Sequence, residues 1–270
     1  MGLSFMLWLG TDKRMNHMLS LSGKKGLILG VANDQSIAWG CALMAKQMGA
    51  EVIVTCQNEK AKGYVEPVTN AENIQLEVCN VEDPGALEVL VKSAVNKLGH
   101  LDFVIHSIAW APLEDLHGRV IDSSSIGFSR AMEVSCHSFA TLAKLCAPHM
   151  PSGGTLLTMS YLGADEAVPH YGLMGPVKAA LESLVRYMAV ELGDKKIRVH
   201  AVSPGPILTR AASGIDHFDE LLRTAAKKSP LGRPVRLEEI ASLSTFLCSD
   251  GASGMTGQTI YVDGGCHAVA

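Results

Sequence analysis

The feature that most constrains the fold of this 270-residue chain is a regular alternation of short apolar runs with longer segments of helical periodicity. The runs typical of strands cover residues 26–31, 51–57, 74–79, 101–108, 155–160, 199–202 and 259–262. The segments typical of helices cover residues 37–48, 59–69, 83–98, 122–148, 170–192, 215–227 and 237–248. Strands that alternate with helices in this way form a parallel sheet. The pattern therefore predicts an α/β fold, a single Rossmann-type doubly wound sheet with helices on both faces.

No repeat and no Pro/Gly-rich linker divides this pattern, so we expect one domain over residues 21–270. Residues 1–20 are expected to form an extension of no catalytic importance. Ligands of such sheets bind beyond the carboxyl ends of the strands. The candidate site residues should therefore follow the strand ends at Gly30, Gln57, Cys79, Ile108, Ser160 and Ser203.

Composition excludes several other classes of protein. A net charge of −4 argues against a nucleic-acid partner, which normally requires a basic surface. No run approaches the roughly 18 apolar residues of a membrane span, so no membrane association is expected. The seven cysteines include no C-x-x-C pair, which argues against disulfides and structural zinc and favours free thiols in the cytoplasm. We expect no metal in the active site.

The first strand–helix junction has the position of a phosphate site. Gly30 ends the strand, and Ser36 and Ile37 open the helix, where free backbone N–H groups attract a pyrophosphate. The usual G-x-G-x-x-G spacing is absent, so this segment alone is equally compatible with a plain turn.

Residues at the next strand ends fit the adenosine half of a dinucleotide. Gln57 stands where NAD-binding proteins often carry an acid that binds the ribose, and no arginine follows it directly to hold a 2′-phosphate. This mildly favours NADH over NADPH. Asn80 could meet the adenine edge or simply form a strand-end turn. His106 precedes the end of its strand and is expected to be structural.

The most specific constellation is Tyr161, Tyr171 and Lys178. Tyr171 and Lys178 are seven residues apart, which places them on one face of the helix predicted over 170–192. A nearby ammonium is expected to lower the pKa of the phenol and help it donate a proton or stabilise an oxyanion. Both could equally be ordinary helix residues. Pro176 indicates that the regular helix begins near Gly175.

Together, these motifs resemble the bacterial enoyl-acyl carrier protein reductases, a divergent branch of the short-chain dehydrogenase/reductase family. The resemblance runs from about Leu21 to the C-terminus. It rests on Gly30-x5-Ser36-Ile37-Ala38, Gln57-Asn58, His106-Ser107-Ile108, Ser160-Tyr161-Leu162-Gly163-Ala164, Tyr171-x6-Lys178, Gly205-Pro206-Ile207, Ala211-Ala212-Ser213-Gly214-Ile215 and Val262-Asp263-Gly264-Gly265.

The resemblance implies reduction of the 2,3-double bond of an enoyl thioester on acyl carrier protein, with NADH or NADPH, by a homotetramer. Tyr161, Tyr171 and Lys178 would be catalytic. The cofactor would contact Gly30, Ser36, Ile37, Gln57, Asn80, Val81, Ile108, Lys178, Ile207 and Thr209, although many relatives carry an aspartate at the position of Asn80. The substrate would contact Ala109, Tyr161, Tyr171, Ala211 and Ile215, and residues 209–227 would cover the acyl chain.

Two other functions remain as alternatives. An ordinary short-chain dehydrogenase acting on alcohols or ketones would carry a serine about thirteen residues before a Tyr-x-x-x-Lys pair, but Thr158 and Gly175 occupy those positions. A dinucleotide sensor on the same fold would not need the Tyr161, Tyr171 and Lys178 set.

Overall fold

The computed structural model describes residues 18–209 and 214–269 and confirms the predicted fold class. Seven parallel strands form one sheet in the order β3-β2-β1-β4-β5-β6-β7. The strands are β1 (Lys25–Leu29), β2 (Glu51–Cys56), β3 (Gln75–Val78), β4 (Phe103–His106), β5 (Gly154–Met159), β6 (Ile197–Pro204) and β7 (Gln258–Val262). Most of the predicted extension lies outside the described residues.

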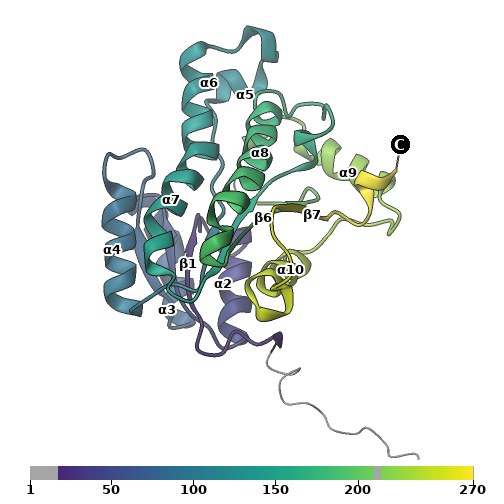
Figure 1. The fold of residues 1–270 in the computed structure, drawn as a ribbon. Helices are drawn as coiled ribbons and strands as arrows, with labels where there is room; N and C mark the ends of the chain where they lie inside the picture. Colours follow the sequence, from purple (N-terminus) through teal and green to yellow (C-terminus); the bar gives the residue numbers. More distant parts are fainter. Residues whose placement is uncertain (1–17, 210–213, 270) are drawn as a thin grey trace, which may run out of the picture.

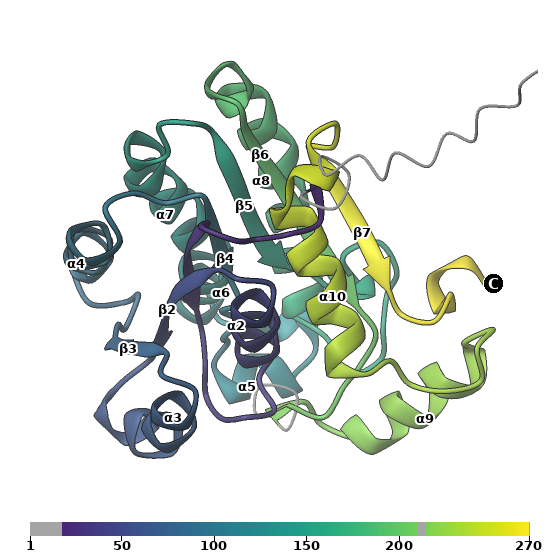
Figure 2. The ribbon, with the colours of Figure 1, turned by 90° about the horizontal axis from the view of Figure 1, so that it is seen from below.

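Helices cover both faces of the sheet (Figures 1 and 2). One layer contains α2 (Ile37–Gln47), α3 (Glu59–Ala71) and α10 (Leu237–Cys248), and the other contains α4 (Ala86–Leu98), α6 (Ser125–Met132), α7 (Ser138–Cys146) and α8 (Met174–Leu192). The short α5 (Leu113–His117) and α9 (Phe218–Lys228) lie beyond the sheet. Within the described ranges, no helix is both long and apolar enough to cross a membrane.

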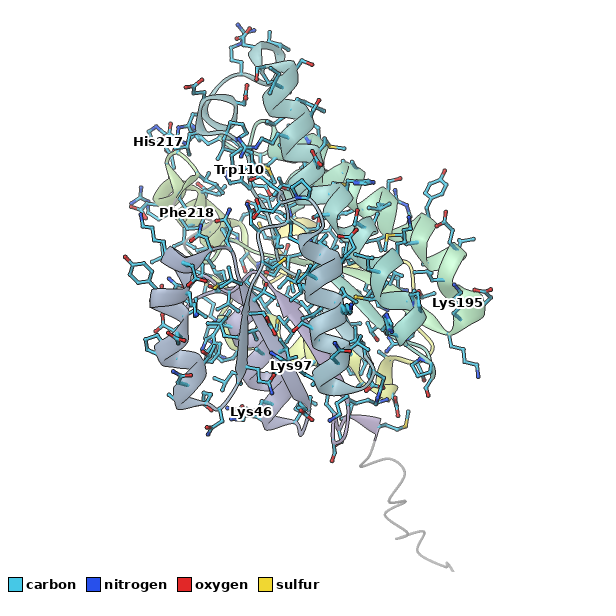
Figure 3. The ribbon with its side chains drawn as sticks, turned by 90° about the vertical axis from the view of Figure 1, so that its left-hand side faces the viewer. Lys46, Lys97, Trp110, Lys195, His217 and Phe218 are labelled. Carbon is cyan, nitrogen blue, oxygen red and sulfur yellow. The ribbon has the colours of Figure 1, made fainter. Side chains whose placement is uncertain are left out.

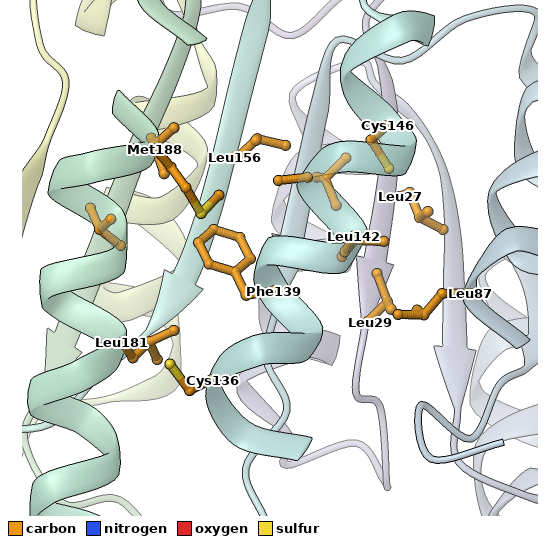
Figure 4. Packing of buried hydrophobic residues seen from close by; sticks show 14 of the residues in the cluster. Leu27, Leu29, Leu87, Cys136, Phe139, Leu142, Cys146, Leu156, Leu181 and Met188 are labelled. Carbon is orange, nitrogen blue, oxygen red and sulfur yellow. The ribbon is translucent and has the colours of Figure 1, made fainter. Parts of the chain in front are cut away.

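The core on the α4, α7 and α8 side is built mainly from aliphatic side chains around Phe139 (Figure 4). Phe139 and Leu142 of α7 are fully buried against strand residues such as Leu156 of β5 and Leu27 of β1. Because both faces of each central strand are covered, the strands are almost continuously apolar rather than alternating. This explains why short apolar runs located them in the sequence.

The strand order reverses between β1 and β4, and this junction opens a crevice at the carboxyl end of the sheet. Gly30, directly after β1, has a φ of 102°. A Cβ there would lie 2.1 Å from the carbonyl oxygen of Ser107, so only glycine lets the two strand ends lie side by side.

Two predicted helices differ from the structure. The helix predicted over 122–148 consists of α6 and α7 joined by a π-helical turn, Glu133–His137. The helix predicted over 170–192 begins at Met174, so the expectation that Tyr171 lies on it is wrong. Pro176 stands in the first turn of α8, where a missing N–H breaks no helical hydrogen bond. The position of Pro176 therefore indicated the helix start correctly.

Candidate active site

A cavity of about 820 Å³ lies at the carboxyl ends of β1, β4, β5 and β6. Figure 3 shows Trp110, which lines it, at the same end of the molecule as the start of α9. Most predicted site residues line this cavity: Gly30, Ser36, Ile37, Ile108, Ala109, Tyr161, Tyr171, Lys178, Ile207, Thr209 and Ile215. Residues from six separate sequence segments thus meet at one place.

The predicted contacts to the adenosine half do not line this cavity. Gln57 is exposed at the end of β2, and Val81 is half-buried. The Asn80 side chain donates a hydrogen bond to Asp83 (2.9 Å) and accepts one from the Glu82 N–H (3.4 Å), which is the geometry of a strand-end turn. That Gln57, Asn80 and Val81 contact the cofactor stays a prediction. Ala211 lies outside the described residues.

The two tyrosines face each other, with ring centroids 4.6 Å apart and a tilt of 60°. Burial raises the pKa of both phenols, and their mutual proximity raises that of Tyr171 further. The expectation that Lys178 lowers the pKa of Tyr171 is therefore wrong: removal from water raises this pKa, and Lys178 is not among the causes of the shift. The Tyr171 phenol stays protonated at neutral pH and can serve as a hydrogen-bond donor.

The turn that carries Tyr171 is tightly constrained. His170 before it and Gly172 after it both have positive φ, 62° and 31°. Gly163, from the segment after β5, lies directly against the ring: a Cβ there would come within 2.4 Å of Tyr171 Cδ1 and 3.3 Å of Tyr161 Cδ1. The space that the two rings occupy thus depends on the absence of a side chain at residue 163.

Lys178 is buried, and its Nζ donates a hydrogen bond to the carbonyl oxygen of Met159 (2.7 Å). Burial lowers the pKa of Lys178 to about 8, an effect that Cys136 and Glu182 partly oppose. Ser160 donates a hydrogen bond to the Glu182 carboxylate, whose pKa is raised by burial. The ammonium is therefore held in place at the end of β5 and loses its proton far more readily than an exposed lysine does.

The helix start at α2 is suited to an anion. The Ser36 side chain accepts hydrogen bonds from the N–H groups of Ala32 (2.9 Å) and Asn33 (3.0 Å) and does not cap the helix. The first N–H groups of α2 therefore have no side-chain partner where Ser36 and Ile37 line the cavity. Such a helix N-terminus binds phosphate groups well. The donor set fits the pyrophosphate of a dinucleotide.

His106 is buried and does not line the cavity. Its Nδ1 lies 3.2 Å from Thr158 Oγ1 and its Nε2 lies 2.8 Å from Ser138 Oγ. Burial, helped by Lys178, lowers the pKa of His106 to about 3, so the imidazole is neutral. These contacts fit the structural role expected for it.

Sequence reasoning missed several residues that line the cavity, among them Trp110 and Met174. Trp110 lies in the segment that follows β4, so the rule that ligands bind beyond strand ends could have found it. The buried Ser135 of the π-helical turn accepts a hydrogen bond from the Trp110 N–H and donates one to the Trp110 carbonyl, both at 2.8 Å. Arg130 lies over the indole at 4.2 Å from its centroid.

Comparisons with known proteins agree on one family. Residues 30–267 match the family model described as enoyl-(acyl carrier protein) reductase. The chain is 42% identical over 250 residues to the enoyl-acyl-carrier-protein reductase (NADH) 1 of Rhizobium meliloti, with 92% of each chain covered. It is 40% identical over 252 residues to the enoyl-acyl-carrier-protein reductase (NADH) of Salmonella typhimurium, with 93% and 96% covered.

A solved structure gives the same result. The enoyl-acyl-carrier-protein reductase of Anaplasma phagocytophilum, determined in complex with NAD, superposes with a TM-score of 0.89 at 42% identity. The superposition covers 94% of this chain and 97% of that one. The match in sequence, in fold and over nearly the full length of both proteins leads to one conclusion: the chain belongs to the enoyl-acyl carrier protein reductase family.

Proposed function

We propose that this chain reduces the carbon–carbon double bond of enoyl thioesters carried by acyl carrier protein, with NADH as the reductant, in fatty-acid biosynthesis. The observation that carries the proposal is the buried Tyr161–Tyr171 pair beside Lys178 at the carboxyl end of the sheet. Relatives with this fold at about 40% identity are named as NADH-dependent reductases of this substrate.

When bound, the nicotinamide would supply a hydride to the β-carbon of the enoyl group. Negative charge would then develop on the thioester oxygen, and a proton from water would complete the reduction at the α-carbon. Tyr171 donates a hydrogen bond to that oxygen and stabilises the enolate. The raised pKa of Tyr171 suits this role, because a deprotonated phenol could not donate a hydrogen bond. Tyr161 packs against the Tyr171 ring, lines the same cavity and assists in holding the thioester.

Lys178 holds the nicotinamide ribose. One of its three N–H groups is used on the Met159 carbonyl, which leaves two for ribose hydroxyls. The start of α2 holds the pyrophosphate, and Ile207 and Thr209, which line the cavity, lie at the nicotinamide end. Gln57, which is exposed at the end of β2, binds the adenosine ribose. Asn80 and Val81 contact the adenine. No arginine follows Gln57 directly, which supports NADH over NADPH.

The acyl chain lies against the part of the cavity bounded by the segment 209–227. Ile215, Phe218 and Leu221 of this segment line the cavity, opposite Leu116 of α5. These side chains provide an apolar surface and no charge. Because Phe218 is the one buried residue of α9, that helix is attached to the body mainly through the surface that would cover the substrate.

Reduction of ketones is the alternative function, and the position of Thr158 argues against it. The serine of ordinary short-chain dehydrogenases would stand at this position, but the Thr158 hydroxyl is buried and donates to the carbonyl of His106 (3.2 Å). Thr158 does not line the cavity, and Gly175 replaces the usual lysine. No residue at these positions could assist reduction of a ketone.

Assembly and location form a second part of the proposal. The chain forms a homotetramer, and the support is a pair of large apolar side chains, Tyr187 and Val190, that are 70% and 83% exposed on α8. Light scattering after gel filtration should give four times 28.7 kDa. The enzyme works in the cytoplasm, which suits seven cysteines that are all unpaired and buried.

The test is the loss of NADH absorbance with a crotonyl thioester, repeated with NADPH and with a simple ketone. We expect turnover with the thioester, faster with NADH than with NADPH, and none with the ketone. Turnover of the ketone alone would move the chain to the ordinary carbonyl reductases. Tight NADH binding without turnover of either substrate would make it a dinucleotide sensor.

A further inference from the structure

Three exposed side chains with metal-binding atoms lie together beside the cavity: His170, Asp216 and His217. One ligand atom from each lies within 4.8 Å of the others. The two imidazole rings are 4.7 Å apart at their centroids, and His217 Nε2 is 3.5 Å from Asp216 Oδ2. Two imidazoles and a carboxylate are the donors that Zn²⁺ and its neighbours among the transition metals prefer.

The geometry requires little rearrangement. A tetrahedral zinc ion with bonds of roughly 2.0–2.2 Å holds its ligand atoms about 3.3 Å apart. The His217–Asp216 distance is already close to this value, and rotation of exposed side chains can close the remaining gap. Three protein ligands leave the fourth position open for water, a common arrangement for zinc.

The three ligands come from two parts of the chain. These two parts must lie close together for the proposed reaction. His170 directly precedes Tyr171 in the constrained turn, whereas Asp216 and His217 belong to the segment 209–227 and stand just before Phe218. Figure 3 shows His217 and Phe218 side by side at the start of α9. An ion bound here would therefore fasten the acyl-chain cover to the turn of Tyr171.

A neighbouring contact holds the segment 209–227 against α5. His117 of α5 donates a hydrogen bond from Nε2 to the Gly214 carbonyl (2.8 Å). A second, smaller hollow of about 290 Å³ is lined by His117, His170 and Asp216, among others. The ligand cluster thus borders a recess that water can reach, which gives a metal ion a route of entry.

We propose that His170, Asp216 and His217 form a binding site for a divalent transition-metal ion, best matched by Zn²⁺, and that the bound ion holds the cover against the Tyr171 turn and slows turnover. The metal site itself is independent of the reaction. Its effect on turnover rests on the proposed function, since it acts by restricting entry and release of the acyl chain.

Calorimetric titration of the chelator-treated protein with ZnCl₂ tests the site. We expect one ion per chain, and at least tenfold weaker binding in His170→Asn and in His217→Asn. Asparagine is chosen because both positions have positive φ, which asparagine tolerates. Co²⁺ should give a visible absorption band that the same variants lose. Asp216→Asn should weaken binding while leaving both imidazoles in place.

His100→Asn is the matched control. His100 Nε2 lies 3.1 Å from Asp102, an imidazole–carboxylate pair without a second histidine, beside the opposite end of β4. This variant should bind zinc like the unmodified protein. Equal zinc affinity in His217→Asn and the unmodified protein, or no binding by the unmodified protein, would overturn the site.

The effect on turnover is measured separately with NADH and a crotonyl thioester. Zinc should slow the unmodified enzyme, a chelator should restore it, and His217→Asn should respond at least tenfold less. Zinc binding without any change in turnover would refute the fastening role. Failure of the chain to reduce the thioester would refute the proposed function, while calorimetry would still decide the metal site.

Discussion

The two sides of the cavity are built on different principles. The proposed catalytic wall, made of Tyr161, Tyr171 and Lys178 and called the catalytic wall below, is embedded in the protein: Tyr171 and Lys178 are only 7% and 3% exposed. The cover wall, made of Ile215, Phe218 and Leu221, belongs to a segment in which Phe218 alone is buried among residues 214–221. Hydrogen bonds and close packing hold the first wall, and few contacts hold the second.

This difference separates two tasks. Groups that stabilise developing charge act best when they are fixed before the reaction, because no reorganisation is then needed. A cover must open and close for a substrate to enter, so it cannot be packed as tightly. Changes in the catalytic wall should therefore alter kcat, whereas changes in the cover wall should alter KM.

The largest effect is expected for Tyr171→Phe. Loss of the phenol hydroxyl removes the donor to the thioester oxygen, which should lower kcat by about 10²–10³. NADH binding, followed by cofactor fluorescence, should stay unchanged. Tyr64→Phe, at an exposed tyrosine of α3 outside the cavity, is the control. Undiminished turnover by Tyr171→Phe would mean that the catalytic wall is wrongly assigned.

Gly163→Ala should come next. The added Cβ would lie 2.4 Å from Tyr171 Cδ1, so the ring must move by about 1 Å to reach a normal contact distance. A displacement of that size should lower kcat at least about tenfold. Overpacking of the buried ring should also lower the free energy of unfolding by roughly 1–3 kcal/mol, which a thermal melt measures. Gly63→Ala in α3, where a Cβ meets nothing within 4 Å, is the control. Equal rates for the two variants would contradict the proposed packing.

The pH dependence of NADH use should reflect Lys178. Its pKa of about 8 means that the free enzyme loses the ammonium as pH rises through that value. We expect kcat/KM for NADH to fall up to tenfold per pH unit above about 8, and Lys178→Met to be less active with no such fall.

The contribution of Lys178 to folding stability changes with pH in the opposite direction to its contribution to activity. Between about 8 and the ordinary value of 10.5, the unfolded chain carries more protons on this lysine than the folded chain does. Its contribution to folding stability therefore increases as pH rises through this window. Thermal melts over the same pH range separate the fall in activity from unfolding. Activity that is flat across this range would exclude the assigned role.

The smallest effect is expected for Leu221→Ala. Removing part of an apolar contact of the cover wall should weaken binding of a long acyl chain by about 1 kcal/mol, which raises KM roughly fivefold. A crotonyl thioester, which is too short to reach this surface, should be affected less. Leu231→Ala, at a leucine 63% exposed and outside the cavity, is the control. A fall in kcat instead would remove the distinction between the walls.

The sheet could be predicted because buried parallel strands consist of consecutive apolar residues. The Leu27–Leu29 stretch of β1 is typical. The catalytic wall was found because Tyr161, Tyr171 and Lys178 are spaced distinctively. The conformation around Tyr171 was harder to predict. Pro176 marked the helix start, but no sequence pattern indicates the positive φ of His170. Similarly, no local sequence pattern marks the π-helical turn at Glu133–His137.

The direction of the pKa shift of Tyr171 could not be predicted from its spacing to Lys178 in the sequence. A lysine seven residues from a tyrosine suggested a lowered phenol pKa, but the sign depends on burial, which is set by distant residues such as Gly163. The grouping of His170 with His217 likewise requires the tertiary fold. The contacts assigned to Gln57, Asn80 and Val81 remain predictions, because these residues lie outside the cavity.

The π-helical turn makes one part of the site depend on residue count. A turn of this kind holds one residue more than an α-helical turn. Deleting a single residue from Glu133–His137 would rotate α6 by about 100° relative to α7 and take Ser135 away from Trp110. No point substitution could restore that arrangement. In evolutionary terms, the gain or loss of one codon in this turn would change the position of the Ser135 anchor of the Trp110 loop.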